Sequence, residues 1–168
     1  MFGFLRAFFV MVFVVTLSAC SSSGSLTMTS GGSVQDLPAS PTLRLVVNPV
    51  VGDSDEVLSD VRSAILSQLM ATGRYTSVVT APVPTDLVIT VDIVKYSKVS
   101  VGERLLVGLL AGKNRVHTDV KITRTSNGAL VKSFHAEGNS AAHPLSSESG
   151  ISDAIREVAK EVASGAIV

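Results

Sequence analysis

The aromatic residues of this 168-residue chain are distributed very unevenly, which limits what its folded part can use as a core. Five of the six Phe lie in the first 19 residues, together with a single charged side chain, Arg6. From residue 20 onward the chain has 13 basic and 14 acidic side chains, no Trp, and three aromatic residues: Tyr75, Tyr96 and Phe134. A domain built from this remainder must form its core mainly from aliphatic side chains.

The composition also excludes several classes of protein. A net charge near zero and so few aromatic residues argue against nucleic-acid binding, and we expect no nucleic-acid partner. The single Cys excludes a disulfide framework within one chain. The sequence contains no phosphate-binding loop, dinucleotide fingerprint, paired-Cys metal motif or Gly-x-Ser-x-Gly elbow. We therefore expect a protein that is not an enzyme and needs no cofactor.

The amino-terminal segment, residues 1–19, has the pattern of a signal peptide. Arg6 precedes an unbroken apolar run over 7–15, which is too short to span a bilayer, since spanning needs roughly 20 residues. The run is followed by Leu17-Ser18-Ala19-Cys20, which resembles the bacterial lipobox, the site at which lipoprotein signal peptides are cut before a Cys that becomes lipidated. The alternative is an uncleaved membrane helix over residues 2–19.

The lipobox resemblance implies cleavage between Ala19 and Cys20, lipidation of Cys20 and attachment to a membrane. Two or more acyl chains hold a protein stably on a bilayer. In enteric-type sorting, a residue other than Asp after the lipidated Cys implies export to the outer membrane, and Ser21 occupies that position. We therefore expect a domain anchored to the outer membrane through its acyl chains and facing the periplasm.

The stretch over residues 20–40 is rich in Ser and Gly and has no clear period, so it reads as a flexible tether. About 20 residues of random coil would reach roughly 25 Å. Residues 41–168 are then expected to form a single domain.

The apolar periodicity of this domain predicts five strands and two helices. The strands are expected at 42–50, 75–80, 86–99, 115–125 and 130–138, and the helices at 53–73 and 149–163. The simplest arrangement is an α+β two-layer sandwich in the order β-α-β-β-β-β-α. In it, a mainly antiparallel sheet of four to five strands carries both helices on one face.

The turn at Ser126-Asn127-Gly128 determines which residues of the last two strands face each other. A three-residue loop with Gly128 as the bulge pairs Val120 with Phe134, whereas a two-residue loop mixes polar and apolar side chains on both faces. We prefer the first register.

The preferred register brings together the four weak candidates for a metal or proton-transfer site. They are His117, Asp119, His135 and Glu137. The alternative is a solvated polar face with two cross-strand ion pairs, each contributing about 0.2–1 kcal/mol, and this interpretation is favoured.

Residues 101–111 form the most apolar stretch after the signal peptide. This stretch either contacts the membrane or a partner protein, or closes one end of the sheet as a buried element. The side chains available for contact are Leu105, Leu106, Val107, Leu109 and Leu110.

Three short motifs resemble a family of small Gram-negative lipoproteins of unknown function. They are Gln68-Leu69-Met70-Ala71-Thr72-Gly73-Arg74-Tyr75, Thr85-Asp86-Leu87-Val88-Ile89 and Leu106-Val107-Gly108-Leu109-Leu110-Ala111-Gly112. Thr85 stands where the family often has Ala. The resemblance implies a lipid-anchored domain of unknown function and transfers no catalytic residue.

Two hypotheses for function follow. The favoured one is a non-enzymatic lipoprotein that binds or supports another protein of the cell envelope, with an apolar patch over 101–111 or an unpaired sheet edge as its signature. The alternative is a periplasmic carrier or binding module for a lipid or small apolar ligand, which needs a pocket of at least about 300 Å³ between the sheet and the helices.

Overall fold

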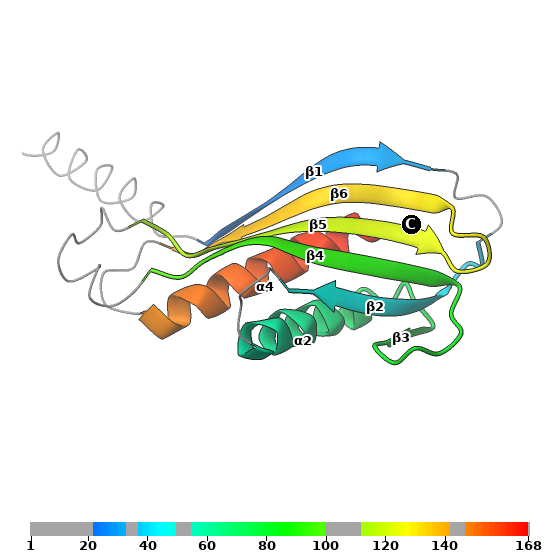
Figure 1. Ribbon diagram of the computed structural model, residues 1–168, viewed down its shortest axis with the longest axis horizontal. Helices are drawn as coiled ribbons and strands as arrows, with labels where there is room; N and C mark the ends of the chain where they lie inside the picture. The colour runs from blue at the N-terminus through cyan, green and yellow to red at the C-terminus, as the bar shows by residue number, and fades with distance from the viewer. Residues whose placement is uncertain (1–21, 33–36, 50–54, 100–111, 142–146, 168) are drawn as a thin grey trace, which may run out of the picture.

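The computed structural model describes residues 22–32, 37–49, 55–99, 112–141 and 147–167. Both helices lie on the same side of a single sheet (Figure 1). The elements, in chain order, are β1 (Ser23–Gly31), β2 (Thr42–Asn48), α2 (Asp55–Ala71), β3 (Ser77–Val79), β4 (Leu87–Ser97), β5 (Arg115–Arg124), β6 (Leu130–Asn139) and α4 (Ser147–Gly165).

The sheet has six strands in the order β1-β6-β5-β4-β2-β3. The predicted α+β class, with two helices on one face, is confirmed, and all seven predicted elements occur in the predicted order. The predicted number of strands was too small, because β1 precedes them. The sheet is also mixed rather than mainly antiparallel, since β2 runs parallel to both β3 and β4.

The parallel pairs follow from the helix that connects them. After β2 the chain passes through α2, which returns it to the end of the sheet where β2 began, so β3 runs in the same direction as β2. Residues 80–86 return the chain to that end again, so β4 also runs parallel to β2. Helix α2 ends at Ala71, and Gly73 follows with φ 63°, as the sequence predicts for a helix stop. Thr72 closes the last turn by donating its hydroxyl to the Leu69 carbonyl.

Strand β1 lies in the stretch that was predicted to be a flexible tether, and that prediction is wrong. Residues 23–31 do not form part of a flexible tether but pair antiparallel with β6, from Ser23 opposite Asn139 to Gly31 opposite Lys132. Leu26 of β1 packs against the core next to α4. The folded unit therefore begins about 20 residues earlier than residue 41, because β6 and α4 need a further strand to cover them.

The hairpin of β5 and β6 has the predicted register. Val120 lies opposite Phe134, and Thr118 lies opposite Ala136. Gly128 has φ 69°, and its amide donates to the Arg124 carbonyl, so the turn is the three-residue loop with a bulge. The alternative two-residue loop is thereby excluded.

The core lies between the sheet and the two helices and is mainly aliphatic, as the composition requires. Phe134 is the largest fully buried side chain, and Tyr75 and Tyr96 are half-buried at its margin. Its strand residues alternate with less buried residues of the opposite face, and β2 and β4 contribute Leu43, Leu45, Val47, Leu87, Ile89, Val91 and Ile93.

Candidate functional site

The four residues proposed for a metal or proton-transfer site lie on the face of the sheet opposite the helices. His117 Nδ1 is 3.1 Å from the Glu137 carboxylate, and His135 Nδ1 is 2.5 Å from the Asp119 carboxylate. Each pair joins facing residues of β5 and β6, as the predicted register requires. The structure therefore shows two cross-strand His–carboxylate pairs on a partly exposed polar face, as in the interpretation favoured from the sequence.

These pairs do not combine into a metal centre. Among the residues that the structure describes, no group of three or more His, Cys, Asp or Glu side chains is placed to hold a metal ion. The carboxylates are partly exposed, so water screens each His–carboxylate contact and the contact contributes little to stability.

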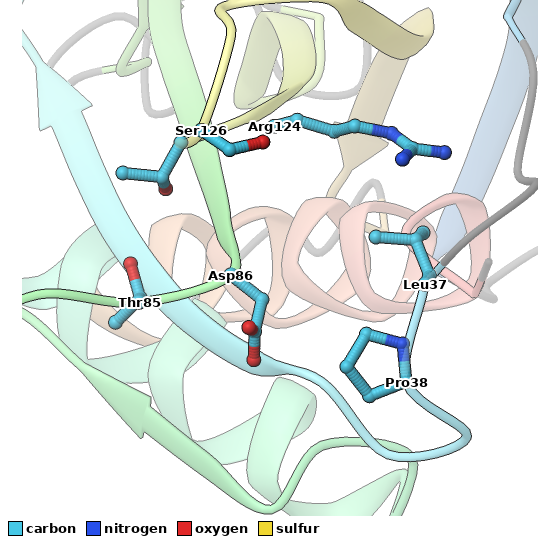
Figure 2. Close-up of a pocket in the computed structure, with 7 residues that line it drawn as sticks. Leu37, Pro38, Thr85, Asp86, Arg124 and Ser126 are labelled. Carbon is cyan, nitrogen blue, oxygen red and sulfur yellow. The ribbon is translucent and has the colours of Figure 1, made fainter.

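A small pocket of about 240 Å³ lies at the end of the sheet where β4 begins and β5 ends. Figure 2 shows Asp86 and Arg124 in its wall, with the Arg124 guanidinium group on the side of Leu37. The Asp86 carboxylate accepts hydrogen bonds at 2.7 Å from the amide and the hydroxyl of Thr42, and these bonds lower the pKa of Asp86 below its usual value.

This pocket does not match the predicted carrier site. Its volume is below the lower end of the usual range for small-molecule sites, about 300 Å³, and it lies at the rim of the sheet rather than between the sheet and the helices. A carboxylate and a guanidinium group in its wall do not suit an apolar ligand. This pocket thus gives no support to a lipid carrier.

The outer edge of β1 is the surface that best fits the predicted signature of a protein-binding domain. Strand β1 is the first strand in the sheet order, so within the described ranges only its inner edge is paired. Its nine residues, Ser-Gly-Ser-Leu-Thr-Met-Thr-Ser-Gly, include no charged residue and no Pro. The register shift between Met28 and Ser30 is the single irregularity in its pairing with β6.

The opposite edge of the sheet is built differently. Strand β3 is only three residues long, so it presents few backbone groups to a partner. Proteins commonly protect sheet edges with short strands, charged side chains, Pro or bulges. Strand β3 is protected by its length, whereas β1 has a bulge but neither charge nor Pro, and it is three times as long.

The other predicted site residues lie outside the residues that the structure describes. They are Ala19, Cys20, Leu105, Leu106, Val107, Leu109 and Leu110. Lipidation at Cys20 and membrane or partner contact over 101–111 remain predictions. In the described part of the chain, neither helix combines the length and the hydropathy that a bilayer span requires.

The β1 edge was not predicted, although a weak signal for it is present. Leu26 and Met28 alternate with Ser25, Thr27 and Thr29, which is the period of a strand, and Thr favours strands. This pattern is short, and the flanking Ser and Gly residues are typical of linkers, so the composition of the segment favoured a flexible tether.

Comparison with known structures identifies the class of fold. PelC from Paraburkholderia phytofirmans, described as a dodecamer, has a TM-score of 0.54 and 18% identity, with 83% of this chain and 96% of that chain covered. A protein from Xanthomonas campestris of the family DUF330 has a TM-score of 0.53 and 11% identity, with 82% of this chain and 87% of that chain covered. At these identities the similarity shows a shared fold.

A match to a family model then identifies the family. Residues 52–144 match the domain of unknown function DUF4410, and the chain belongs to this family. The predicted membership of a family of unknown function is thereby confirmed. The search of curated proteins found no sequence similar to this chain.

Proposed function

We propose that this chain is a non-enzymatic lipoprotein of the outer membrane that faces the periplasm and binds another envelope protein through the outer edge of β1. Strand β1 carries the proposal because it offers nine residues of uncharged backbone edge. An extended segment of a partner can add to such an edge through main-chain hydrogen bonds, while its side chains select the partner.

The side chains along β1 favour this mode of binding. Ser25 and Thr27 project from the face of the sheet away from the helices, next to Glu137 and His135 of β6. Met28 is 48% exposed, so a large apolar side chain is accessible on a strand of mostly Ser and Thr. A partner strand would thus find backbone donors and acceptors, hydroxyl groups and one apolar contact.

Two further observations support a role in protein assembly rather than catalysis. PelC, which shares the fold, is described as a dodecamer, so this fold is used for contacts between proteins. The acidic and imidazole groups described above are engaged in pairs or hold strands together, as Asp86 does with Thr42.

The lipid anchor is tested by membrane fractionation of the wild type and a Cys20→Ala variant, with mass spectrometry of the mature amino terminus. We expect an acylated wild type in the membrane fraction and an unacylated variant outside it. A wild type that is soluble, or that keeps residues 1–19, would contradict the anchor.

Partner binding is tested by placing a photo-crosslinking amino acid at Thr27 in cells that produce the protein naturally. We expect a discrete crosslinked product whose yield falls sharply when Ser25→Lys and Met28→Lys are added, because edge lysines block strand addition. The matched control carries Thr125→Lys and Ser126→Lys in the β5–β6 turn and should keep the product. A product made of two copies of this chain would show that the partner is the protein itself, and equal yields from all variants would exclude the β1 edge.

A further inference from the structure

The start of β1 is fixed to the domain very close to the predicted lipidation site. The Ser22 hydroxyl donates to the Glu157 carboxylate of α4 at 3.2 Å, and β1 begins at the next residue. The same Glu157 carboxylate forms an ion pair with Lys160, whose Nζ is 2.9 Å from Glu157 Oε1. Only Ser21 lies between Cys20 and Ser22, so the two Cα atoms are at most about 7 Å apart in any conformation.

This short connection limits where the membrane can lie. A tether over residues 20–40 would have allowed the domain to stand roughly 25 Å from the bilayer, in any orientation. With β1 beginning at Ser23, an acylated Cys20 instead holds the near end of the sheet at the headgroups. That end contains the start of β1, the end of β4, the start of β5 and the end of β6 (Figure 1).

A row of paired residues connects β1 to a group of basic side chains at this end. Ser23 lies opposite Asn139, Asn139 opposite Arg115, and Arg115 opposite Ser97. Neighbouring strands are about 4.8 Å apart, so Arg115 is about 10 Å from Ser23 across the sheet. The acyl anchor and Arg115 are therefore held at one end of the same sheet.

Three Lys residues accompany Arg115. Lys95 lies two residues before Ser97 on β4, opposite His117, and Lys98 directly follows β4. Lys113 precedes β5, and the chain around it is fixed because the Asn114 side chain accepts a hydrogen bond from the Val99 amide at 2.7 Å.

These four basic side chains have no ion-pair partner among the residues that the structure describes. Two acidic groups of the described residues near this end are already engaged, Glu137 with His117 on the sheet and Asp153 with Arg156 on α4. A cluster of cations without an acidic partner in the described part of the chain, beside a membrane anchor, is complementary to anionic lipid headgroups.

Resting on the lipid anchor of the proposed function, we infer that Lys95, Lys98, Lys113 and Arg115 form a docking surface for anionic phospholipid headgroups. The surface orients the domain with the β5–β6 turn away from the bilayer. Strand β5 separates the two ends by about 30 Å. Each cation that contacts an anionic surface shifts the equilibrium between docked and free orientations by about fivefold.

The test uses the mature, acylated protein in vesicles of phosphatidylethanolamine with or without phosphatidylglycerol. Cys20 is the single Cys of the chain and its thiol is blocked by the lipid, so an introduced Cys can be labelled selectively. One fluorophore is attached through Ser97→Cys near the docking surface, and another through Ser126→Cys in the distant turn. A quencher on the lipid headgroups then reports which end lies at the membrane.

We expect strong quenching at position 97 and weak quenching at position 126, with a difference that grows with phosphatidylglycerol and shrinks as salt is added. In the variant K95Q/K98Q/K113Q/R115Q, most of the difference in quenching between the two positions should disappear. The control R62Q/R74Q/K121Q/K132Q removes the same number of charges elsewhere and should keep this difference. Circular dichroism of both variants establishes that they are folded.

Equal quenching at the two positions, or a difference that the first variant leaves intact, would overturn the docking surface. Failure of the lipid anchor would look different, because mass spectrometry would show unacylated Cys20 and the protein would not float with the vesicles. The two proposals can thus fail separately.

Discussion

The Asp86 carboxylate fastens the start of β4 to the start of β2 by accepting hydrogen bonds from both the amide and the hydroxyl of Thr42, each at 2.7 Å. The Thr42 hydroxyl also accepts a bond from the Asp86 amide at 2.9 Å. These bonds join two parallel strands that are far apart in the sequence, with Leu43 and Leu87 as the first paired residues.

Removing the hydrogen bonds between Asp86 and Thr42 should lower the free energy of unfolding, and the size of this loss should depend on pH. Because the bonds lower the pKa of Asp86 in the folded state, its contribution is present above the unfolded pKa and is lost as the pH falls through the folded value. Asp86→Ala should cost about 1 kcal/mol at neutral pH. Denaturant unfolding at several pH values checks this prediction. The difference in unfolding free energy between the wild type and Asp86→Ala should become smaller below about pH 4. Thr42→Ser keeps both bonds and should behave like the wild type, so a similar loss in that variant would contradict this account.

Truncation distinguishes a structural β1 from a tether. A protein beginning at residue 22 should be stable, whereas one beginning at residue 41 should lose at least about 2 kcal/mol, because Leu26 no longer covers the core and β6 becomes an edge. Denaturant unfolding and light scattering measure the stability and the aggregation of the two proteins. Equal stability would show that β1 is dispensable.

Gly138 should tolerate no side chain, because helix α4 crosses directly over it. A Cβ atom at this position would lie 2.0 Å from the Ala154 carbonyl oxygen and 2.5 Å from the Val158 amide nitrogen. Both are backbone atoms, so Gly138→Ala would displace α4 and should cost about 3 kcal/mol or more. Gly31→Ala is the control, since a Cβ there meets nothing within 4 Å. In thermal unfolding, Gly138→Ala should have a markedly lower Tm than Gly31→Ala.

Tyr75 should give the protein a distinct sensitivity to alkaline pH. Its hydroxyl donates to the Ala166 carbonyl, and burial raises the pKa of Tyr75 from 10.0 to about 12. A raised pKa means that the stabilisation is complete below the unfolded value and is lost as the pH rises from 10 toward 12. Tyr75→Phe should cost about 1 kcal/mol at neutral pH and should flatten the fall in unfolding free energy above pH 10. An unchanged alkaline slope in the variant would contradict this assignment.

The two His–carboxylate pairs should not respond to metal. Adding zinc or a chelator should leave Tm unchanged, since ligand binding to the folded state would raise Tm and the described residues hold no cluster of three ligands. Asp119→Asn should cost less than about 1 kcal/mol, because the pair with His135 is partly exposed. A zinc-dependent rise in Tm that His117→Gln and His135→Gln abolish would restore the metal-site hypothesis.

The residue pattern alone predicted the local elements and one long-range register. Periodicity located both helices and five strands, because burial of one face imposes a spacing that can be seen within a few turns or pleats. The pairing of Val120 with Phe134 was also predictable, since a one-residue slip would have moved the apolar side chains of one strand to the wrong face. The contacts of His117 with Glu137 and of His135 with Asp119 follow from that register.

The sequence by itself thus determined the order of the elements, the aliphatic core and the predicted lipobox, because each depends on residue types and spacings along a short stretch of chain. Only the tertiary structure decided that residues 23–31 join the sheet and that β2 runs parallel to β4. Both depend on which strand edges are left unpaired once the helices pack on one face. A segment of Ser, Gly and Thr does not carry that information in its own composition, because its place in the sheet is set by β6 and α4, more than 100 residues away in the chain.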